Sequence, residues 1–308
     1  MKGEIMKDVI IIGNGPAGIT AAIYGVRAGL DTLLVSDAPN GGGQIATTYE
    51  VDNYPGLLHV GGMELGDKFL EHAKELGAAE MTARVSAIRD EGDHKVVVTE
   101  KEELETKTVI IATGADHSKL GVPGEQELVG MGVSYCATCD GAFFRKRTVA
   151  VVGGGDVALG DAIFLSRFAA KVYLIHRRDA FRGAKMLQEQ VKEKENIEIC
   201  YDTIVTSVVG TDMVEKLLIK NVKSGEESEL AVNGVFMAVG IRPNLDGLTG
   251  LPEQNEAGYI VAGESCETSI PGIFAAGDVR TKQLRQVITA AADGANAITS
   301  VERYLAGA

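Results

Sequence analysis

Two cysteines three positions apart, Cys136 and Cys139, are the residues best suited to covalent chemistry. A C-x-x-C pair serves either as half of a zinc site or as a dithiol that cycles with a disulfide. Zinc needs two further ligands, whereas Cys200 and Cys266 stand alone and the chain has only five histidines. The sequence therefore favours a redox pair and predicts no metal site. One thiolate would attack a partner disulfide and the other would resolve the mixed disulfide.

Asp140 directly follows this pair and is a candidate for moving a proton to or from a departing thiolate. Its place before Gly141 suits a turn or a helix cap equally well, so both interpretations stay open here. Cys200 ends a strand-like segment, and both it and Cys266 are interpreted as packing residues.

A glycine-rich turn follows an apolar, β-branched run near the start of the chain. The segment GNGPAG lies between a predicted strand over 8–12 and a predicted helix over 17–28, the context in which G-x-G-x-x-G indicates dinucleotide binding. Gly13 allows the tight turn, Gly15 lets backbone N–H groups approach a pyrophosphate, and Gly18 lets the helix pack closely. The helix N-terminus adds its positive dipole end.

The residue that ends the next predicted strand, 32–36, is Ser36, where an acidic residue often binds a ribose. Asp37 follows it. The adenosine end of the ligand is therefore less constrained than its pyrophosphate.

A second glycine cluster, GGGDVA at 153–158, repeats this fingerprint between a predicted strand over 148–152 and a predicted helix over 157–168. The following strand, 171–176, ends in a basic run with one more arginine a turn later: His176, Arg177, Arg178 and Arg182. Arginines at the ribose position can bind a 2′-phosphate, which favours NADPH over NADH. A solvated basic surface is the alternative, but this run lies at the ribose position in an acidic chain.

Gly13 and Gly153 lie 140 positions apart, so the chain holds two copies of one nucleotide-binding unit rather than a short repeat. Its 308 residues correspond to about two domains. The remaining patterns predict helices over 64–76 and 285–305 and strands over 95–99 and 108–112. The predicted fold is α/β, with two Rossmann-like nucleotide-binding domains.

Acidic residues outnumber basic ones by 43 to 30, and the net charge is −13. Such a chain repels phosphate backbones, so no nucleic-acid partner is expected. No apolar run approaches the roughly 18 residues that span a bilayer, and the N-terminal segment lacks a signal-peptide cleavage site. We therefore expect no membrane association and a cytoplasmic location.

Several motifs occur in a characteristic order: GNGPAGITAAIY, GGGQIATTYEVDNYPG, IIATGA, YCATCDGAFF, VAVVGGGD, HRRDAFR, FAAGDVR and LRQVITAAADGANA. On these motifs the chain resembles the low-molecular-weight thioredoxin reductases nearly end to end. These are flavin-dependent pyridine nucleotide-disulphide oxidoreductases. The resemblance implies a homodimer that passes electrons from NADPH through FAD and a disulfide to thioredoxin. It also implies that the two Rossmann-like, three-layer domains are nested. A discontinuous FAD domain, 1–116 and 247–308, would enclose an NADPH domain, 117–246, with linking strands near 115–120 and 243–250.

The resemblance also implies the site residues. Cys139 would lie nearer the flavin, Cys136 would attack thioredoxin, and Asp140 would be the acid/base. FAD would be held by Gly13, Gly15, Pro16, Ala17, Gly18, Ser36, Gly43, Gln44, Asn53, Val85, Gly114, Asp278, Arg285 and Gln286. NADPH would be held by Gly153, Gly155, Asp156, Val157, His176, Arg177, Arg178, Arg182 and Gly240.

The helix after the second glycine cluster departs from the family pattern. Val157 stands where the family has a hydroxyl residue, and Gly160 and Asp161 replace two glutamates. The main interpretation remains a thioredoxin reductase fed by NADPH. The alternatives are ferredoxin or NADH as donor, or a glutaredoxin-like partner. A flavin-binding redox sensor would require inert cysteines, which nothing in the sequence indicates.

Overall fold

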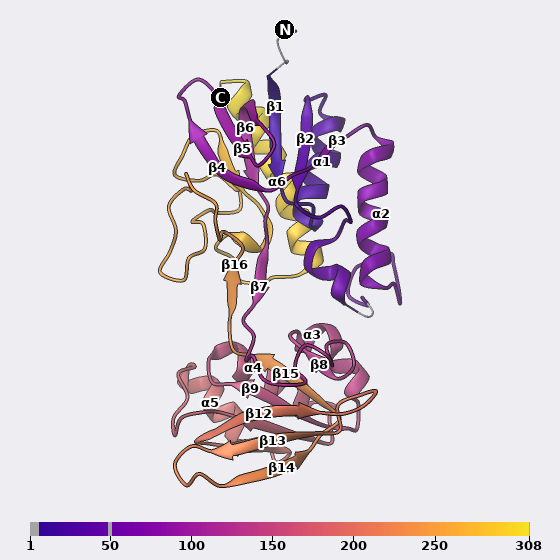
Figure 1. The fold of residues 1–308 in the computed structure, drawn as a ribbon, viewed down its shortest axis with the longest axis vertical. Coiled ribbons are helices and arrows are strands. Elements are labelled where there is room, and N and C mark those ends of the chain that lie inside the picture. Colours follow the sequence, from indigo (N-terminus) through magenta and orange to yellow (C-terminus); the bar gives the residue numbers. More distant parts are fainter. Residues whose placement is uncertain (1–5, 49–50, 308) are drawn as a thin grey trace. The chain divides into compact units, whose positions relative to one another are not determined.

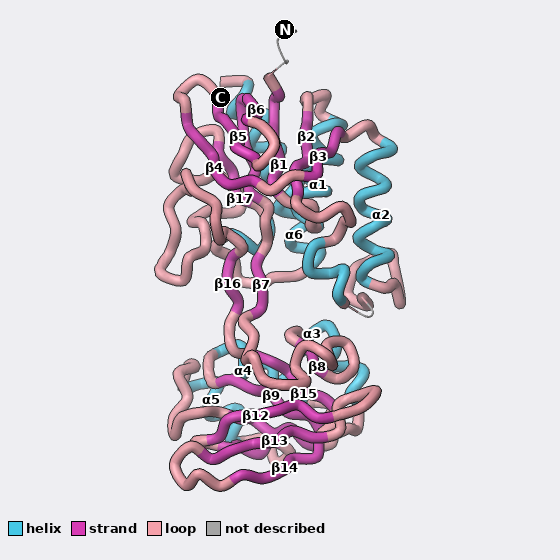
Figure 2. The backbone as a smooth tube through the Cα atoms, in the orientation of Figure 1, coloured by secondary structure: helices cyan, strands magenta, loops and turns pink. Residues whose placement is uncertain are grey.

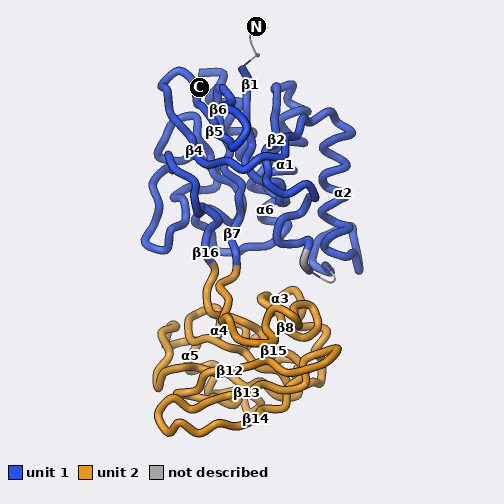
Figure 3. The backbone as a smooth tube through the Cα atoms, in the orientation of Figure 1, with its two compact units in different colours: residues 1–116, 242–308 blue, residues 117–241 orange. Residues whose placement is uncertain are grey.

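Three stretches of chain build two separate units in the computed structural model (Figure 3). Unit 1 comprises residues 1–116 and 242–308, and unit 2 comprises residues 117–241. The model describes residues 6–48 and 51–307. Residues 1–5 and 49–50 lie outside the described residues. The first range belongs to the N-terminal segment predicted not to be a signal peptide, and the second lies within the motif GGGQIATTYEVDNYPG.

Unit 1 is built on a mixed sheet whose central strand, β1, comes from the apolar run before the first glycine turn. The sheet runs in the order β3-β2-β1-β6-β5-β4, and β17 also pairs with β6. β1 pairs in parallel with β2 and β6, whereas β5 and β4 continue antiparallel. The strands are β1 (Lys7–Ile12), β2 (Thr32–Ser36), β3 (Ala79–Thr82), β4 (Val85–Asp90), β5 (Lys95–Thr99), β6 (Glu103–Ile111) and β17 (Ile273–Ala275).

Two helices from opposite ends of the chain, α1 and α6, lie side by side in unit 1 (Figure 1). Small residues allow this approach: a Cβ built on Gly294 would lie 2.2 Å from the carbonyl oxygen of Ala17. Pro16 suits the first helical position of α1, because proline has the right φ and no N–H is needed there. The helices of the unit are α1 (Pro16–Arg27), α2 (Gly62–Glu75), α6 (Val287–Leu305) and the 3-10 turns η1 (Gly43–Thr47) and η3 (Gly277–Val279).

Unit 2 is also built on a sheet, here fully parallel, in the order β11-β10-β9-β15-β8. An antiparallel meander, β12-β13-β14, forms a further layer, as the tube in Figure 2 shows. The strands are β8 (Val133–Ser134), β9 (Thr148–Gly153), β10 (Lys171–Ile175), β11 (Ile197–Cys200), β12 (Thr203–Val209), β13 (Lys216–Asn221), β14 (Glu227–Ala231) and β15 (Gly234–Ala238). The helices are α3 (Ala137–Asp140), η2 (Gly141–Phe144), α4 (Asp156–Ser166) and α5 (Lys185–Lys192).

The chain passes between the units through two strands, β7 (Ala115–His117) and β16 (Ile241–Pro243), which pair with each other. The amide of Asn244 donates to the carbonyl of Gly114 at 3.0 Å. This bond ties the segment after β16 to unit 1. The second boundary lies after residue 241, whereas the family resemblance implied one after residue 246.

The predicted fold class is confirmed, and several predicted elements begin and end within one residue of the predicted bounds. The strands expected over 32–36 and 95–99 are β2 and β5, and the helix expected over 17–28 is α1. β6 begins at Glu103 rather than at 108, because its first half alternates exposed and buried residues at the sheet's antiparallel side. Within the described part of the chain, no helix combines the length and apolar character needed to cross a bilayer.

Candidate functional site

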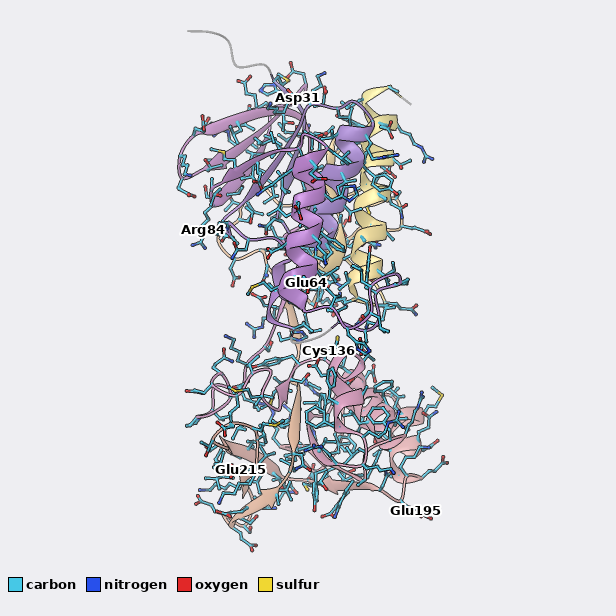
Figure 4. All side chains as sticks on the ribbon, turned by 90° about the vertical axis from the view of Figure 1, so that its right-hand side faces the viewer. Asp31, Glu64, Arg84, Cys136, Glu195 and Glu215 are labelled. Atoms are coloured by element: carbon cyan, nitrogen blue, oxygen red, sulfur yellow. A yellow bond between two sulfur atoms is a disulfide. The ribbon has the colours of Figure 1, made fainter. Side chains whose placement is uncertain are left out.

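The two cysteines of the C-x-x-C motif form a disulfide in unit 2. Their Cα atoms are 5.3 Å apart, and Cys136 caps the short helix α3, which contains Cys139. Both residues are partly exposed, so the sulfurs lie at the surface of the unit rather than in its core. Figure 4 shows Cys136 at the opposite end of unit 2 from Glu195 and Glu215. A surface disulfide on a single turn of helix is accessible to thiol–disulfide exchange.

Asp140 ends α3 and is linked to the cysteine pair through Ser134. The Ser134 hydroxyl donates to Asp140 Oδ2 at 2.6 Å and accepts the backbone N–H of Cys136 at 3.0 Å. Within the described residues, Asp140 Oδ1 is buried without a hydrogen-bond partner. Burial raises the pKa of Asp140, and the bond from Ser134 offsets part of that rise. A buried carboxyl with a raised pKa is suited to hold a proton for a thiolate.

A second carboxylate, Glu125, fixes the residue that precedes the pair. Glu125 is fully buried, and its Oε1 accepts the hydroxyl of Tyr135 at 2.9 Å and the backbone N–H of Leu120 at 2.9 Å. Its Oε2 accepts the N–H of Gly121 at 2.6 Å. Burial and the bond to Glu125 raise the pKa of Tyr135, so its hydroxyl remains a donor. Glu125 therefore ties the segment after β7 to the start of the redox motif.

The first glycine turn has the close approaches that its spacing predicts. A Cβ on Gly13 would lie 2.4 Å from the carbonyl oxygen of Ala112, and one on Gly18 would lie 1.8 Å from that of Gly13. Gly15 caps α1 and has nothing within 4 Å of an added Cβ. The turn is therefore closed where helix and strand meet and open at the helix N-terminus, the arrangement that a pyrophosphate needs.

Several residues far apart in the sequence line this turn. A Cβ on Gly43 would lie 3.3 Å from the Cα of Gly15, and one on Gly277 would lie 2.8 Å from the Cβ of Ala17. Gly277 begins η3, which carries Asp278. Among the described residues, Asp278 Oδ1 and Thr113 Oγ1 are buried with no hydrogen-bond partner. Two orphaned polar atoms beside an open glycine turn fit a large polar ligand such as a dinucleotide.

The predicted residues at the start of α6 also come together. Asn53 donates from its amide to Gln286 Oε1 at 2.8 Å, although the two lie 233 positions apart. The Arg285 guanidinium carbon lies 4.2 Å from the centre of the Tyr259 ring. Burial raises the pKa of Asp278, while Lys282 and Arg285 lower it. Cations and a helix N-terminus thus surround this part of the site, which favours an anionic ligand.

Other predicted residues of unit 1 lie at the ends or edges of elements. Ser36 ends β2, and its hydroxyl accepts the N–H of Ala38 at 3.1 Å, which supports the loop. Val85 begins β4, Gln44 lies in η1, and Gly114 has φ +73 before β7. Their contact with a ligand remains a prediction.

The second glycine turn, in unit 2, is built in the same way. A Cβ on Gly153 would lie 2.3 Å from the carbonyl oxygen of Ala238, whereas Gly155 caps α4 and opens into free space. Asp156 Oδ1 accepts the N–H of Ala184 at 2.6 Å, which holds the loop before α5 against the turn. Val157 is 60% exposed in the first turn of α4, so an exposed apolar side chain stands at the position where the family resemblance implies a hydroxyl residue.

The residues of the basic run after β10 differ in burial, since the histidine is buried and the arginines are exposed. His176 is buried, its ring lies 2.2 Å from where a Gly154 Cβ would be, and burial lowers its pKa. Arg177 and Arg178 are exposed, and the N–H of Arg182 donates to the Gly154 carbonyl at 2.8 Å. Binding of a ligand by the exposed arginines stays a prediction, whereas His176 packs against the turn from within. Gly240, with φ +126, lies at the start of the return to unit 1.

Residues that sequence reasoning did not identify also shape both sites. Asn14 is buried and donates to the carbonyls of Ala38 and Asn40, joining the first turn to the next loop. Thr113, Ser134 and Glu125 have the roles described above. Only Thr113 carries a sequence signal, since it is a polar residue two positions after the buried end of β6. The remaining cysteines form no disulfide, and burial raises their pKa to about 11 for Cys200 and about 12 for Cys266.

Comparisons with known proteins extend over nearly the whole chain. The family model described as "Pyridine nucleotide-disulphide oxidoreductase" matches residues 7–294. A thioredoxin reductase of Bacillus subtilis is 44% identical over 306 residues, 99% of this chain and 96% of that protein. One from Peptoclostridium acidaminophilum is 42% identical, with 98% of each chain covered. The crystal structure of thioredoxin reductase from Streptococcus pyogenes matches with a TM-score of 0.93 and 44% identity, covering 98% of this chain and 99% of that one.

Proposed function

The chain belongs to the pyridine nucleotide-disulphide oxidoreductase family, and from this we propose that it is a thioredoxin reductase that uses NADPH and FAD. One observation carries the proposal. A surface disulfide, Cys136–Cys139, occurs with its own buried carboxylate in a chain that matches named thioredoxin reductases over nearly its full length.

FAD fits unit 1. The open turn at Gly15 and the N-terminus of α1 suit its pyrophosphate, and the orphaned oxygen of Asp278 suits a ribityl hydroxyl. Asn53 and Gln286, already bonded to each other, would border the flavin ring. When bound, FAD would accept a hydride from NADPH and pass its two electrons to the disulfide. We assign FAD binding to unit 1 and NADPH binding to unit 2 on these grounds.

The cysteines and Asp140 supply the exchange chemistry. In the reduced dithiol, the Cys136 thiolate attacks a sulfur of the thioredoxin disulfide and forms a mixed disulfide, and one thioredoxin sulfur leaves as a thiolate. Cys139 then attacks Cys136, re-forms the Cys136–Cys139 disulfide and releases the second thioredoxin sulfur. Asp140 holds the proton that a leaving thiolate takes up. Two electrons thus pass from the dithiol to thioredoxin.

NADPH is favoured as the donor over ferredoxin or NADH. The open turn at Gly155 would receive the pyrophosphate, and the exposed side chains of Arg177, Arg178 and Arg182 follow β10, where they would bind a 2′-phosphate. Named thioredoxin reductases among the relatives agree with the main interpretation. On the resemblance alone, we also propose that the protein is a homodimer and that it is located in the cytoplasm. Sedimentation of the purified protein would test whether it is a dimer.

Two measurements on the purified holoprotein test the function. Anaerobic mixing with NADPH should bleach the flavin absorbance, and reduced ferredoxin should not substitute. Cys136→Ser should retain this bleaching and lose thioredoxin reduction, whereas Cys200→Ser should retain both. Bleaching by ferredoxin alone would refute the donor, and thioredoxin turnover in Cys136→Ser would refute the role of the pair.

A further inference from the structure

Four cations border the redox helix of unit 2. Arg145, Lys146 and Arg147 follow η2 directly, and Arg167 caps the C-terminal end of α4. The N–H of Lys146 donates to the carbonyl of Phe168 at 2.8 Å, so this segment runs beside the end of α4. All four side chains are exposed, and within the described ranges, 6–48 and 51–307, none of them forms an ion pair.

These cations lie close to the Cys136–Cys139 disulfide. The chain from Cys136 to Arg145 consists of α3 and η2, whose rise of at most about 2 Å per residue limits the separation to roughly 18 Å. A Cβ on Gly141 would lie 3.1 Å from Phe168, so the junction of the two helices packs on the end of α4 that carries Arg167. Phe143, between the cysteines and the cations, is 43% exposed.

The local charge opposes that of the whole chain, which is −13. Arg167 has a structural use, because it complements the dipole of α4 and lies 5.8 Å from the centre of the Phe164 ring. The other three have none in the described structure. Lys146 even adopts φ +60, a conformation that glycine or asparagine takes more readily.

We infer that Arg145, Lys146 and Arg147 dock thioredoxin by attracting acidic side chains that border its disulfide. This inference rests on the proposed function, since it names the surface that presents the substrate to Cys136. Exposed charges of this kind act chiefly on encounter and orientation, and salt screens them beyond about 10 Å at 0.1 M. The exposed ring of Phe143 offers an apolar contact in the same area.

The test compares thioredoxin kinetics of the holoenzyme and its variants, with Bacillus subtilis thioredoxin as the probe. Arg145→Gln with Arg147→Gln, and separately Lys146→Asn, should raise the KM for thioredoxin at least about threefold at low salt, with kcat within about twofold. Both should flatten the fall of kcat/KM with added NaCl. Lys146→Asn is decisive, because asparagine suits φ +60 and should fold at least as well. Lys194→Gln, exposed in the same unit beside Glu195, is the matched control and should change nothing.

A variant of the thioredoxin probe tests the same interaction from the partner's side. In this variant, the acidic residues that flank the thioredoxin disulfide are changed to the corresponding amides. The wild-type enzyme should have a higher KM for this altered thioredoxin than for the unaltered one. Combining the altered thioredoxin with the enzyme variants should raise the KM little further. Unchanged KM and salt dependence in the variants, or an equal change in Lys194→Gln, would overturn the inference. Its failure is distinct from that of the proposed function, because thioredoxin would then still be reduced. Anaerobic flavin bleaching by NADPH should be the same in all these variants.

Discussion

Asp293 on α6 and Arg280 after η3 form a two-point ion pair, with Oδ1 2.6 Å from Nη2 and Oδ2 2.8 Å from Nε. Lys282 Nζ and the backbone N–H of Gly277 also donate to Oδ2, each at 2.9 Å. Asp293 and Arg280 are buried. One carboxylate therefore holds both ends of the turn that carries Asp278.

Removing that carboxylate charge should destabilise unit 1 strongly. Asp293→Asn leaves two buried cations uncompensated and should lower the free energy of unfolding by about 3–5 kcal/mol. Urea unfolding measures this, with Glu229→Gln in the exposed Lys216–Glu229 pair as the control, expected to change it by less than about 1 kcal/mol. Burial raises the Asp293 pKa, but the bonds from Arg280 and Lys282 outweigh this and lower it below 3.8.

The pH dependence follows from that lowered pKa. The contribution of Asp293 is complete above the unfolded carboxyl pKa near 3.8 and is lost as the pH falls through the lower, folded value. Wild type and Asp293→Asn should therefore converge in stability only in strong acid. Equal stability at pH 7 would show that the pair contributes nothing.

Asp140 should set the pH dependence of disulfide exchange. Its pKa is raised by burial and partly lowered by the Ser134 bond, so Ser134→Ala should raise it further. If the protonated carboxyl is the active form, the rate falls as pH rises through this pKa, and Ser134→Ala should move that fall to higher pH. Asp140→Asn should slow the step about 100-fold or more.

Single-turnover oxidation of the pre-reduced enzyme by thioredoxin, measured across pH, separates these effects. Ser166→Ala, which removes a hydroxyl elsewhere in unit 2, is the control for Ser134→Ala and should keep the wild-type profile. A rate profile that does not move in Ser134→Ala would contradict the acid/base role.

The sequence allows much of this architecture to be predicted where the determining contacts are local. The turns at Gly13 and Gly153 depend on neighbouring residues, and the C-x-x-C pair closes within one turn of helix. The meander β12-β13-β14 and α5 were not predicted, since their alternation is weak and partly exposed. The links from Ser134 to Asp140 and from Arg280 to Asp293 depend on tertiary packing, which no spacing rule shows.

The arginines after β10 should distinguish NADPH from NADH. Arg177→Ala with Arg178→Ala removes charge-assisted bonds worth about 1.5–3 kcal/mol each, so the KM for NADPH should rise tenfold or more. The KM for NADH, which lacks the 2′-phosphate, should change little. Steady-state kinetics with both nucleotides measures this, and Arg303→Ala on α6 is the control. A proportional rise for both nucleotides would show that the arginines do not bind the extra phosphate.

Asp161 on α4 should make unit 2 less stable at alkaline pH. Burial raises its pKa to about 7, far above that of an unfolded carboxyl. Stability should therefore fall as pH rises from about 4 to about 7, by as much as about 4 kcal/mol. Asp161→Asn should be more stable than wild type at pH 8 and equal to it near pH 4, as measured by urea unfolding. Glu189→Gln, at an exposed site on α5, is the control, and parallel profiles for wild type and Asp161→Asn would contradict the burial effect.

Gly160, inside α4, should be replaceable with a gain in stability. Nothing lies within 4 Å of a Cβ built there, and alanine is favoured over glycine in a helix by about 1 kcal/mol. Gly160→Ala should therefore raise the free energy of unfolding by about 0.5–1 kcal/mol in urea titrations. Gly18→Ala, inside α1, is the contrasting control, because its Cβ would lie 1.8 Å from the Gly13 carbonyl oxygen and the variant should be destabilised. A loss of stability in Gly160→Ala would mean that this face of α4 is closed to even one methyl group.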